Sequence, residues 1–303
     1  MANSRSIICW KRRLFSTKYD LSFYLPRLAL ASLLLCVLSG LVLAFHYRPF
    51  GNVFESIEEI TTVIPYGFFF RRLHYASGQA FTILTMLHVL DYFFKKRYQG
   101  YSVGKWFLLT SPVCISFFLL FTGFILKGDK EGLFAGNILL NTVSEIPVFG
   151  ATLSCLLIRP GTGFYFLPYI HHCLFLPLLL VFLLYDHIKA WLPERNFILI
   201  TTLFLFAYSI FIKMPVDIPP WADSSTVKGP WFFLGIQRLL RIIPPLIAGI
   251  IIPVVFFLLF SIMPLFKGRL QIIARYLLIL STLFYAALTL AGSFFMEYSC
   301  GIF

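Results

Sequence analysis

Charged residues are scarce in this sequence: Asp, Glu, Lys and Arg make up 13% of its 303 residues. Soluble domains carry about 25% charged residues, so the composition excludes an ordinary soluble domain. Paired cysteines are lacking as well, because the six cysteines are scattered and form no CxxC or CxxCH motif. The sequence therefore gives no sign of a CxxCH-type haem attachment site or of a zinc site.

Long apolar runs take the place of charge. Hydrophobic residues make up 59% of the chain, and the mean hydropathy is +0.85. About 20 apolar residues span a bilayer, and such a span is helical because hydrocarbon cannot satisfy a bare backbone. The sequence predicts an all-α membrane protein with about seven transmembrane helices. They lie in the runs Leu28–Tyr47, Leu73–Phe94, Trp106–Leu126, Pro160–Tyr185, Asn196–Ile212, Ile242–Phe266 and Tyr276–Met296.

The formal net charge of +12 does not indicate a nucleic-acid partner, because the basic residues are divided among the connections between spans. With the N-terminus inside, the inner connections hold Lys11, Arg12, Arg13, Lys18, Lys95, Lys96, Arg97, Lys105, Lys189, Arg195, Lys267, Arg269 and Arg275. Most acidic loop residues then fall outside: Glu55, Glu58, Glu59, Asp129, Glu131, Glu145, Asp217 and Asp223. This positive-inside pattern predicts an N-terminus inside and a C-terminus outside.

The segment Lys189–Arg195 divides the chain into two halves, and all six histidines precede it. We therefore expect a cytoplasmic N-terminal segment at residues 1–22, a four-helix domain at 23–190 and a three-helix domain at 191–303. Two segments on the outer side, Lys127–Arg159 and Met214–Arg241, are too long to be plain turns. Long patterned loops on one side of the membrane predict a binding site there.

Four histidines are spaced so that each pair shares a helix face. His74 and His88 lie 14 residues apart, which leaves a net rotation of ~40° and a separation of about 21 Å along a helix. His172 and His187 lie 15 residues apart, with a net offset of ~60°. His171 is offset from His187 by ~160°, so we select His172 as the residue that shares a face with His187.

The topology sets the levels of these histidines. The second and fourth spans both run from outside to inside, so His74 and His172 lie near the outer surface and His88 and His187 near the inner one. Two histidines at one level of a helical bundle can ligate one haem axially, which predicts two haems between the first four helices. Two other interpretations stay open. Intramembrane histidines also hydrogen-bond between helices, and a transporter uses them as a proton relay.

The order of the histidines and of the motifs around them is specific. In chain order the sequence contains His46-Tyr47-Arg48-Pro49, Arg71-x-x-His74, His88, Phe121-Thr122-Gly123-Phe124, Ser144-Glu145-Ile146-Pro147, His172-x4-Pro177, His187 and Gly229-Pro230-Trp231-Phe232-Phe233. Over most of residues 22–266 the sequence resembles cytochrome b of the quinol–cytochrome c oxidoreductase complexes. It is most similar to bacterial and plastid types, with the N- and C-terminal parts fused in one chain.

The resemblance implies electron transfer from quinol through two non-covalent haems b, in a proton-translocating quinol oxidoreductase of the respiratory chain. The haem irons would be held by His74 and His172 at the outer level and by His88 and His187 at the inner level. The resemblance further implies a bacterial-type inner membrane and a dimeric complex. A Rieske iron–sulfur subunit, a c-type cytochrome, or both would be the partners, and no nucleic acid is expected.

The resemblance also assigns roles around the outer haem. Arg71 would pair with a haem propionate, as suits a guanidinium at a membrane edge. Gly40 and Gly123 would let haem approach the first and third helices. At the inner level the corresponding positions, fourteen residues earlier, carry Pro26 and Leu109, which alters the packing expected there.

The outer quinol pocket departs from the family pattern. Pro147, Pro230 and Trp231 mark the pocket region, but Pro230 stands where the family's Pro-Glu-Trp-Tyr motif has its Glu. Glu145 is the candidate catalytic carboxylate in its place, and its alternative role is that of a solvated loop residue. The Pro-Trp that ends the family's third helix is Lys127-Gly128 here. These departures keep a second function open: a non-bifurcating di-haem anchor that conducts electrons between quinone and an extracytoplasmic redox subunit.

Overall fold

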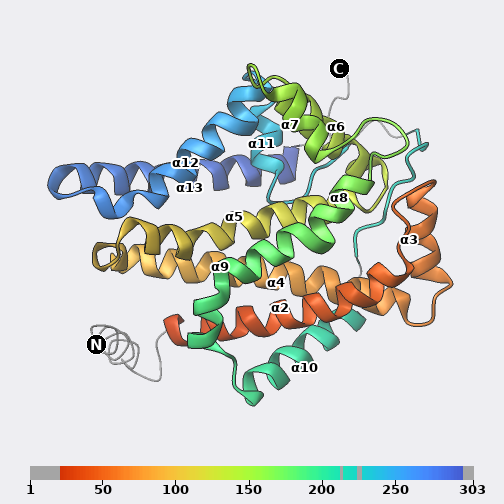
Figure 1. Ribbon diagram of the computed structural model, residues 1–303, viewed down its shortest axis with the longest axis horizontal. Coiled ribbons are helices and arrows are strands. Elements are labelled where there is room, and N and C mark those ends of the chain that lie inside the picture. Colours follow the sequence, from red (N-terminus) through yellow and green to blue (C-terminus); the bar gives the residue numbers. More distant parts are fainter. Residues whose placement is uncertain (1–20, 212–213, 224–226, 296–303) are drawn as a thin grey trace.

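The computed structural model describes residues 21–211, 214–223 and 227–295. These residues form helices and loops and contain no strand. In Figure 1 the long helices run side by side, and α3 and α6 lie toward one end. The helices are α2 (Leu21–His46), α3 (Val53–Thr62), α4 (Gly67–Phe94), η1 (Arg97–Gly100), α5 (Val103–Ile125), α6 (Lys130–Ser144), α7 (Gly150–Leu157), α8 (Phe166–Ile170), η2 (His171–Phe175), α9 (Leu176–Trp191), α10 (Arg195–Phe211), α11 (Leu234–Leu239), η3 (Ile247–Ile251), α12 (Ile252–Ser261), η4 (Met263–Leu265) and α13 (Gly268–Phe295).

The first four long helices form a bundle. Helix α2 packs along α4, and α5 contacts both α4 and α9 (Figure 1). All four contribute to one apolar cluster, in which Ala29 of α2 and Phe81 of α4 meet Leu180 and Leu184 of α9, with Leu119 of α5 against them. Between helices surrounded by lipid, close van der Waals packing of such side chains stabilises the bundle, because lipid tails are as apolar as the side chains themselves. The all-α fold predicted from the sequence is confirmed.

The second half of the chain packs on two sides of this bundle. Helix α10 lies against α2 and α4, whereas α12 contacts α5 and is followed by α13. The indole N–H of Trp106 on α5 donates a hydrogen bond of 2.8 Å to the backbone carbonyl of Phe260 on α12. Both residues lie in an apolar cluster with Met263 and Leu278, which joins the two halves.

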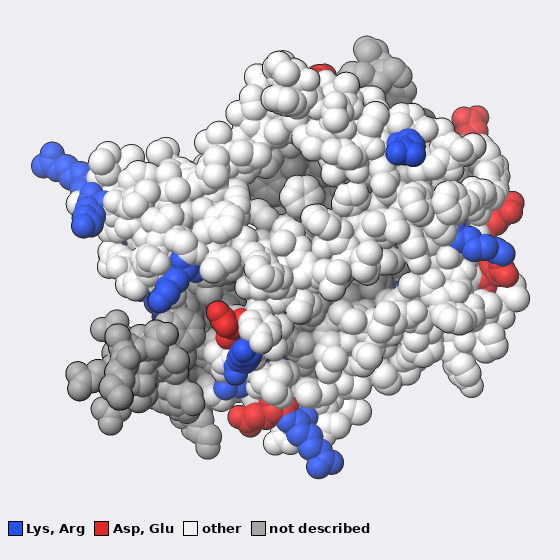
Figure 2. All heavy atoms as spheres, viewed as in Figure 1, with Lys and Arg blue, Asp and Glu red and all other residues white. Residues whose placement is uncertain are grey.

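In the part of the chain that the structure describes, four helices are long and apolar enough to cross a membrane: Leu21–His46, Val103–Ile125, Phe166–Trp191 and Gly268–Phe294. Two shorter apolar helices, Arg195–Phe211 and Ile247–Ser261, and α4 occupy the remaining predicted runs. In Figure 2 a wide uncharged area separates the charged side chains near one end of this face from those near the other. Every predicted run therefore contains a helix, and the number of seven spans stays a prediction.

The helix boundaries differ from the predicted runs at several places. Helix α2 begins at Leu21 rather than Leu28, and α4 begins at Gly67 rather than Leu73. The fourth helix begins at Phe166 rather than Pro160, because Gly161 adopts a φ of +90° and turns the chain first. It also continues to Trp191. The last helix begins at Gly268, eight residues before the apolar run at Tyr276, since the basic residues Arg269 and Arg275 form its first two turns.

Candidate functional site

The outer pair of histidines faces across the bundle. His74 of α4 and His172 of η2 have ring centroids 5.9 Å apart. The His74 Nδ1 lies 2.9 Å from the carbonyl oxygen of Cys36 on α2, and the His172 Nδ1 lies 3.0 Å from that of Leu119 on α5. A carbonyl only accepts, so each Nδ1 carries the ring proton. Each Nε2 therefore keeps a free lone pair, which is the usual state of a metal-binding imidazole.

Two glycines make room for these imidazoles. A Cβ on Gly40 would lie 2.8 Å from the Cε1 of His74, and a Cβ on Gly123 would lie 2.8 Å from the Cε1 of His172. The sequence interpretation assigned these glycines to contact with haem. In the structure each one lies against a histidine, so it fixes the position of the ring as well.

The inner pair has a different environment. The ring centroids of His88 and His187 are 5.7 Å apart, and the ring of Trp191 lies beside both. His88 is buried, and neither of its ring nitrogens has a hydrogen-bond partner. An unpaired buried polar group costs about 1–3 kcal/mol. A ligand bound to this imidazole would remove part of that cost.

A cavity adjoins the inner pair, and Pro26 and Leu109 form part of its wall. These are the two residues at which the sequence predicts altered packing at the inner level. The other lining residues are Ala29, Leu30, Phe81, Thr85, His88, Val89, Leu108, Pro112, Leu184 and His187. The lining is apolar apart from Thr85 and the two imidazoles, as suits a hydrophobic macrocycle.

Both pairs fit a bis-histidine haem. Two metal–nitrogen bonds of about 2 Å, plus the distance from each nitrogen to its ring centre, place two axial imidazoles roughly 6 Å apart. Among the described residues no three His, Cys, Asp or Glu side chains converge on one point that could hold a bare metal ion. Two opposed imidazoles suit a metal whose other ligands come from a macrocycle.

The π-helical turn η2 explains how a 15-residue interval produces this geometry. It spans His171–Phe175, and Pro177 follows in the first turn of α9. A π-turn takes up one additional residue, so the remaining 14 residues bring His187 within ~40° of the direction of His172. His171 is held by its own helix instead, since its Nδ1 donates to the Leu167 carbonyl at 2.6 Å.

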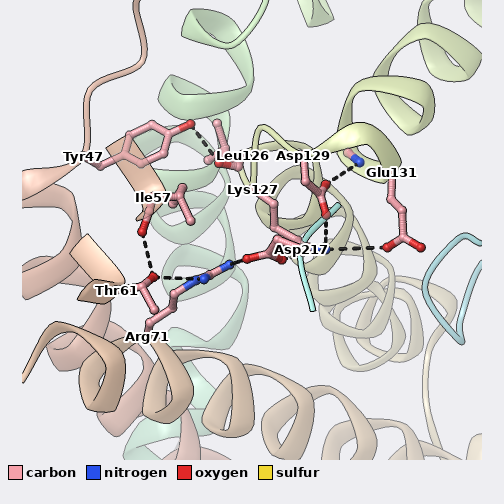
Figure 3. Close-up of polar contacts among 10 residues, drawn as sticks. Tyr47, Ile57, Thr61, Arg71, Leu126, Lys127, Asp129, Glu131 and Asp217 are labelled. Carbon is pink, nitrogen blue, oxygen red and sulfur yellow. Dashed lines mark hydrogen bonds and ion pairs between the residues drawn. The ribbon is translucent and has the colours of Figure 1, made fainter. Parts of the chain in front are cut away.

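Arg71 lies in a largely buried charge cluster, at the end of the bundle that the sequence predicts to be the outer one (Figure 3). It forms an ion pair with Asp217 and donates a hydrogen bond of 3.0 Å to Thr61. Lys127 lies 2.6 Å from Asp129, 3.2 Å from Asp217 and 3.6 Å from Glu131. The five charged residues of this cluster, called the outer charge cluster below, are Arg71, Lys127, Asp129, Glu131 and Asp217.

Sequence reasoning missed this cluster. Asp217 and Glu131 were interpreted as acidic residues of outer loops, and Lys127 only as a departure from a family motif. The three side chains expose 6%, 16% and 17% of their surface, which is too little for freely solvated groups. No spacing rule joins positions 71, 127 and 217, so the sequence offered no signal beyond Lys127 at the end of an apolar run.

Two of the residues predicted for the quinol pocket, Pro230 and Trp231, lie beside an apolar cluster. Phe232 and Phe233, next to Pro230 and Trp231, pack with Phe121 of α5. The cluster also takes side chains from α6 and from residues 157–165, so both outer segments contribute to it. The Trp231 indole donates to the Gln79 amide oxygen on α4 at 2.8 Å.

Glu145 and Pro147 lie on the turn after α6, and both are exposed. The Glu145 carboxylate accepts a hydrogen bond of 3.1 Å from the backbone N–H of Leu246, just before η3. Glu145 therefore has a structural contact with the second half of the chain, which leaves its predicted catalytic role open.

Histidines that face each other across a bundle of apolar helices are typical of haem-binding membrane cytochromes. Residues 11–195 match the family model of cytochrome b/b6/petB, so the chain belongs to the cytochrome b family. This finding confirms the family resemblance inferred from the sequence.

Several relatives carry the same likeness. The chain is 27% identical over 172 residues to the cytochrome b6 of Heliomicrobium gestii, which covers 55% of this chain and 81% of that protein. It is 24% identical over 294 residues to the cytochrome b of Solanum tuberosum, which covers 84% of this chain and 74% of that protein. It is 27% identical over 122 residues to the menaquinol:cytochrome c reductase cytochrome b subunit of Geobacillus thermodenitrificans, which covers 40% of this chain and 54% of that protein.

A solved structure shares the fold. A chain of a hyperthermophilic respiratory Complex III superposes with a TM-score of 0.68, covering 96% of this chain and 89% of that one. The sequence identity is 17%, so this likeness concerns the fold alone.

Proposed function

We propose that the chain is the cytochrome b subunit of a quinol-oxidising respiratory complex and carries electrons between two haems b. The observation that supports this most directly is the pairing of four histidines at two levels, with ring separations of 5.9 and 5.7 Å. His74 and His172 would hold the outer haem, and His88 and His187 the inner one. Each bound haem would supply a one-electron couple, and the protein sets its level and surroundings.

The chain's own residues orient and shield these sites. The carbonyls of Cys36 and Leu119 fix the tautomer of the outer imidazoles, which raises the basicity of the ligating nitrogen. Arg71 keeps its proposed pairing with a haem propionate. It lies one helix turn from His74, and its guanidinium also pairs with Asp217 and Thr61.

Quinol would be oxidised at the outer apolar cluster, in the region of Pro147, Pro230 and Trp231. An aromatic and aliphatic lining suits a quinone ring, and it excludes water from the reacting hydroxyls. The electrons would leave singly, one into this chain and one to a Rieske-type or c-type partner. We extend the proposal to a dimeric, proton-translocating complex in a bacterial-type inner membrane, with the N-terminus inside.

The second candidate is a di-haem anchor that does not divide the two electrons of quinol. The observation that favours it is Pro230, which cannot accept a proton where the family motif has a Glu. In that case the protein would co-purify with an extracytoplasmic redox subunit and no Rieske protein.

The test begins with the complex purified in detergent. A dithionite-reduced minus oxidised spectrum identifies haem b, and a pyridine haemochrome assay counts haems per chain. Two non-covalent haems that a quinol can reduce are the expected result. Absence of haem from a folded preparation contradicts the proposal and supports a proton relay through the histidines. Co-purification of a Rieske subunit separates the first candidate from the second.

A further inference from the structure

The outer charge cluster contains more negative than positive groups. Its cations are Arg71 and Lys127, and its anions are Asp129, Glu131 and Asp217, so full ionisation would leave one uncompensated negative charge. Asp129 has no exposed side-chain surface and Asp217 exposes 6%. In so dry a place excess charge is costly, and it is relieved most readily when one carboxylate binds a proton.

The contacts identify which carboxylate binds that proton. Asp217 pairs with both Arg71 and Lys127. Asp129 lies 2.6 Å from the Lys127 ammonium and accepts a 2.8 Å hydrogen bond from the backbone N–H of Gly132. Glu131 is the least compensated, because its distance to Lys127 is 3.6 Å. Its other partner is the backbone N–H of Lys228.

Electrostatics agree with this order. Burial raises the pKa of Glu131 above its ordinary value. Lys127 and the backbone N–H of Lys228 act to lower that pKa and the nearby Asp129 to raise it, but burial is the largest effect. Burial lowers the pKa of Lys127, but the carboxylates around it raise that pKa more strongly, so the ammonium keeps its charge. Tyr165 also lies near Asp129, and burial together with Asp129 raises the pKa of Tyr165 to about 12.

The position of Glu131 connects this carboxyl to the quinol pocket. Lys228, which binds it through the backbone, lies two residues before Pro230 and three before Trp231. Ala135, four residues after Glu131 and on the same face of α6, is buried in the apolar cluster that contains Phe232. The Glu131 side chain is also 16% exposed, so it contacts the outer solvent on its other side.

We propose that Glu131 is the proton-accepting carboxyl of the outer quinol site, taking one proton from the pocket beside residues 228–231 and releasing it to the outer solvent. This inference rests on the proposed function, quinol oxidation at that pocket. One quinol yields one quinone, two electrons and two protons. The two electrons leave singly to the one-electron carriers named above. Glu131 takes one of the two protons, and the other is released to the outer solvent on the side of the redox partner. Glu131 thereby does what Pro230 cannot.

The experiment uses the purified complex and decylubiquinol as the probe. Reduction of haem b is followed from pH 5 to pH 9 in the unmutated protein and in the variant Glu131→Gln, which keeps the shape of the side chain but cannot take a proton. The rate needs the ionised carboxylate, so it rises with pH through the pKa of Glu131. We expect Glu131→Gln to be at least tenfold slower and to lack this acid limb. Glu58→Gln, an exposed change on α3, is the matched control and keeps it.

A second measurement does not depend on turnover. A redox-induced infrared difference spectrum, driven by an electrode without quinol, should contain the C=O band of a protonated carboxyl that disappears in Glu131→Gln and persists in Glu58→Gln. If Glu131→Gln does not assemble haem, Glu131→Asp takes its place, with an acid limb that is retained but shifted.

Several results would overturn the inference. They are an unchanged pH profile and an unchanged infrared band in Glu131→Gln, an unshifted limb in Glu131→Asp, and loss of the limb in Glu145→Gln instead. If quinol fails to reduce haem in the unmutated protein at every pH, the proposed function itself fails and this inference falls with it.

Discussion

His74 and His172 face each other with ring centroids 5.9 Å apart, and each donates its Nδ1 proton to a carbonyl of a neighbouring helix rather than of its own. The ring of His74 is thereby tied to α2 and the ring of His172 to α5. All four helices of the bundle thus take part in positioning the two imidazoles, although only two of them supply a histidine.

Replacement of His172 by Ala should reduce the haem count from two per chain to one. The outer haem would lose an axial ligand, whereas His88 and His187 would keep the inner one. The matched control is His171→Ala, because His171 bonds to its own helix at Leu167. The pyridine haemochrome assay measures the count. Equal loss of haem in both variants would contradict the choice of His172.

An added methyl group at Gly123 should displace the His172 ring. The new Cβ would lie 2.8 Å from Cε1, closer than unbonded carbon atoms approach. We expect Gly123→Ala to lose or weaken the outer haem and to keep the inner one, as measured by redox titration of the two haem b components. Gly104→Ala on the same helix is the control, because nothing lies within 4 Å of its Cβ position. A normal outer haem in Gly123→Ala would show that the ring has room to move.

Loss of the carboxylate at Asp217 should destabilise the protein. The substitution Asp217→Asn removes the carboxylate with which Arg71 pairs inside the protein, and removal of one member of a buried ion pair costs about 3–5 kcal/mol. The exposed pair of Arg48 and Glu59 is the comparison, since Glu59→Gln should cost about 1 kcal/mol or less. Thermal unfolding in detergent measures both, and equal midpoints for the two variants would contradict the importance of burial.

The contribution of Lys127 to the stability of the fold should be lost at strongly alkaline pH. The surrounding carboxylates hold its pKa in the folded state above the ordinary value, although burial opposes them. A raised pKa of a basic group means that its contribution is complete below the unfolded value of about 10.4 and is lost as pH rises through the folded one. The difference in unfolding midpoint between the unmutated protein and Lys127→Met should therefore be constant up to about pH 10 and shrink above it. A difference that shrinks near neutral pH would contradict this assignment.

Much of the fold follows from the sequence, because length and apolarity suffice to identify a spanning helix. The histidine pairs were predictable for a related reason, since helical geometry converts an interval of 14 into one face. The interval of 15 predicted a less aligned pair than the structure contains. A π-turn cannot be read from apolar periodicity, although Pro177 indicated a local disturbance by removing one backbone donor.

The outer charge cluster was not predictable in the same way. Its residues come from α4, from the start of α6 and from the loop after α10, and each segment taken alone looks like a solvated connection. Only the three-dimensional arrangement shows that Asp217 turns inward to Arg71. The two glycines were predictable in part. The sequence predicted that a haem approaches the helices closely at Gly40 and Gly123, and the structure shows that the histidine rings also lie against these two positions.

The long sequence separation between Arg71 and Asp217 also sets the order in which the two ends of the bundle can be completed during synthesis. Arg71 is synthesised long before position 217 leaves the ribosome. With the predicted topology, α10 inserts before that segment can return to the side of the membrane where Arg71 lies. Until then Arg71 lacks the carboxylate of Asp217. The inner histidines have no such dependence, because the residues that line their cavity all precede α10. The nascent chain can therefore complete its inner site first, and the outer site closes when the second half arrives.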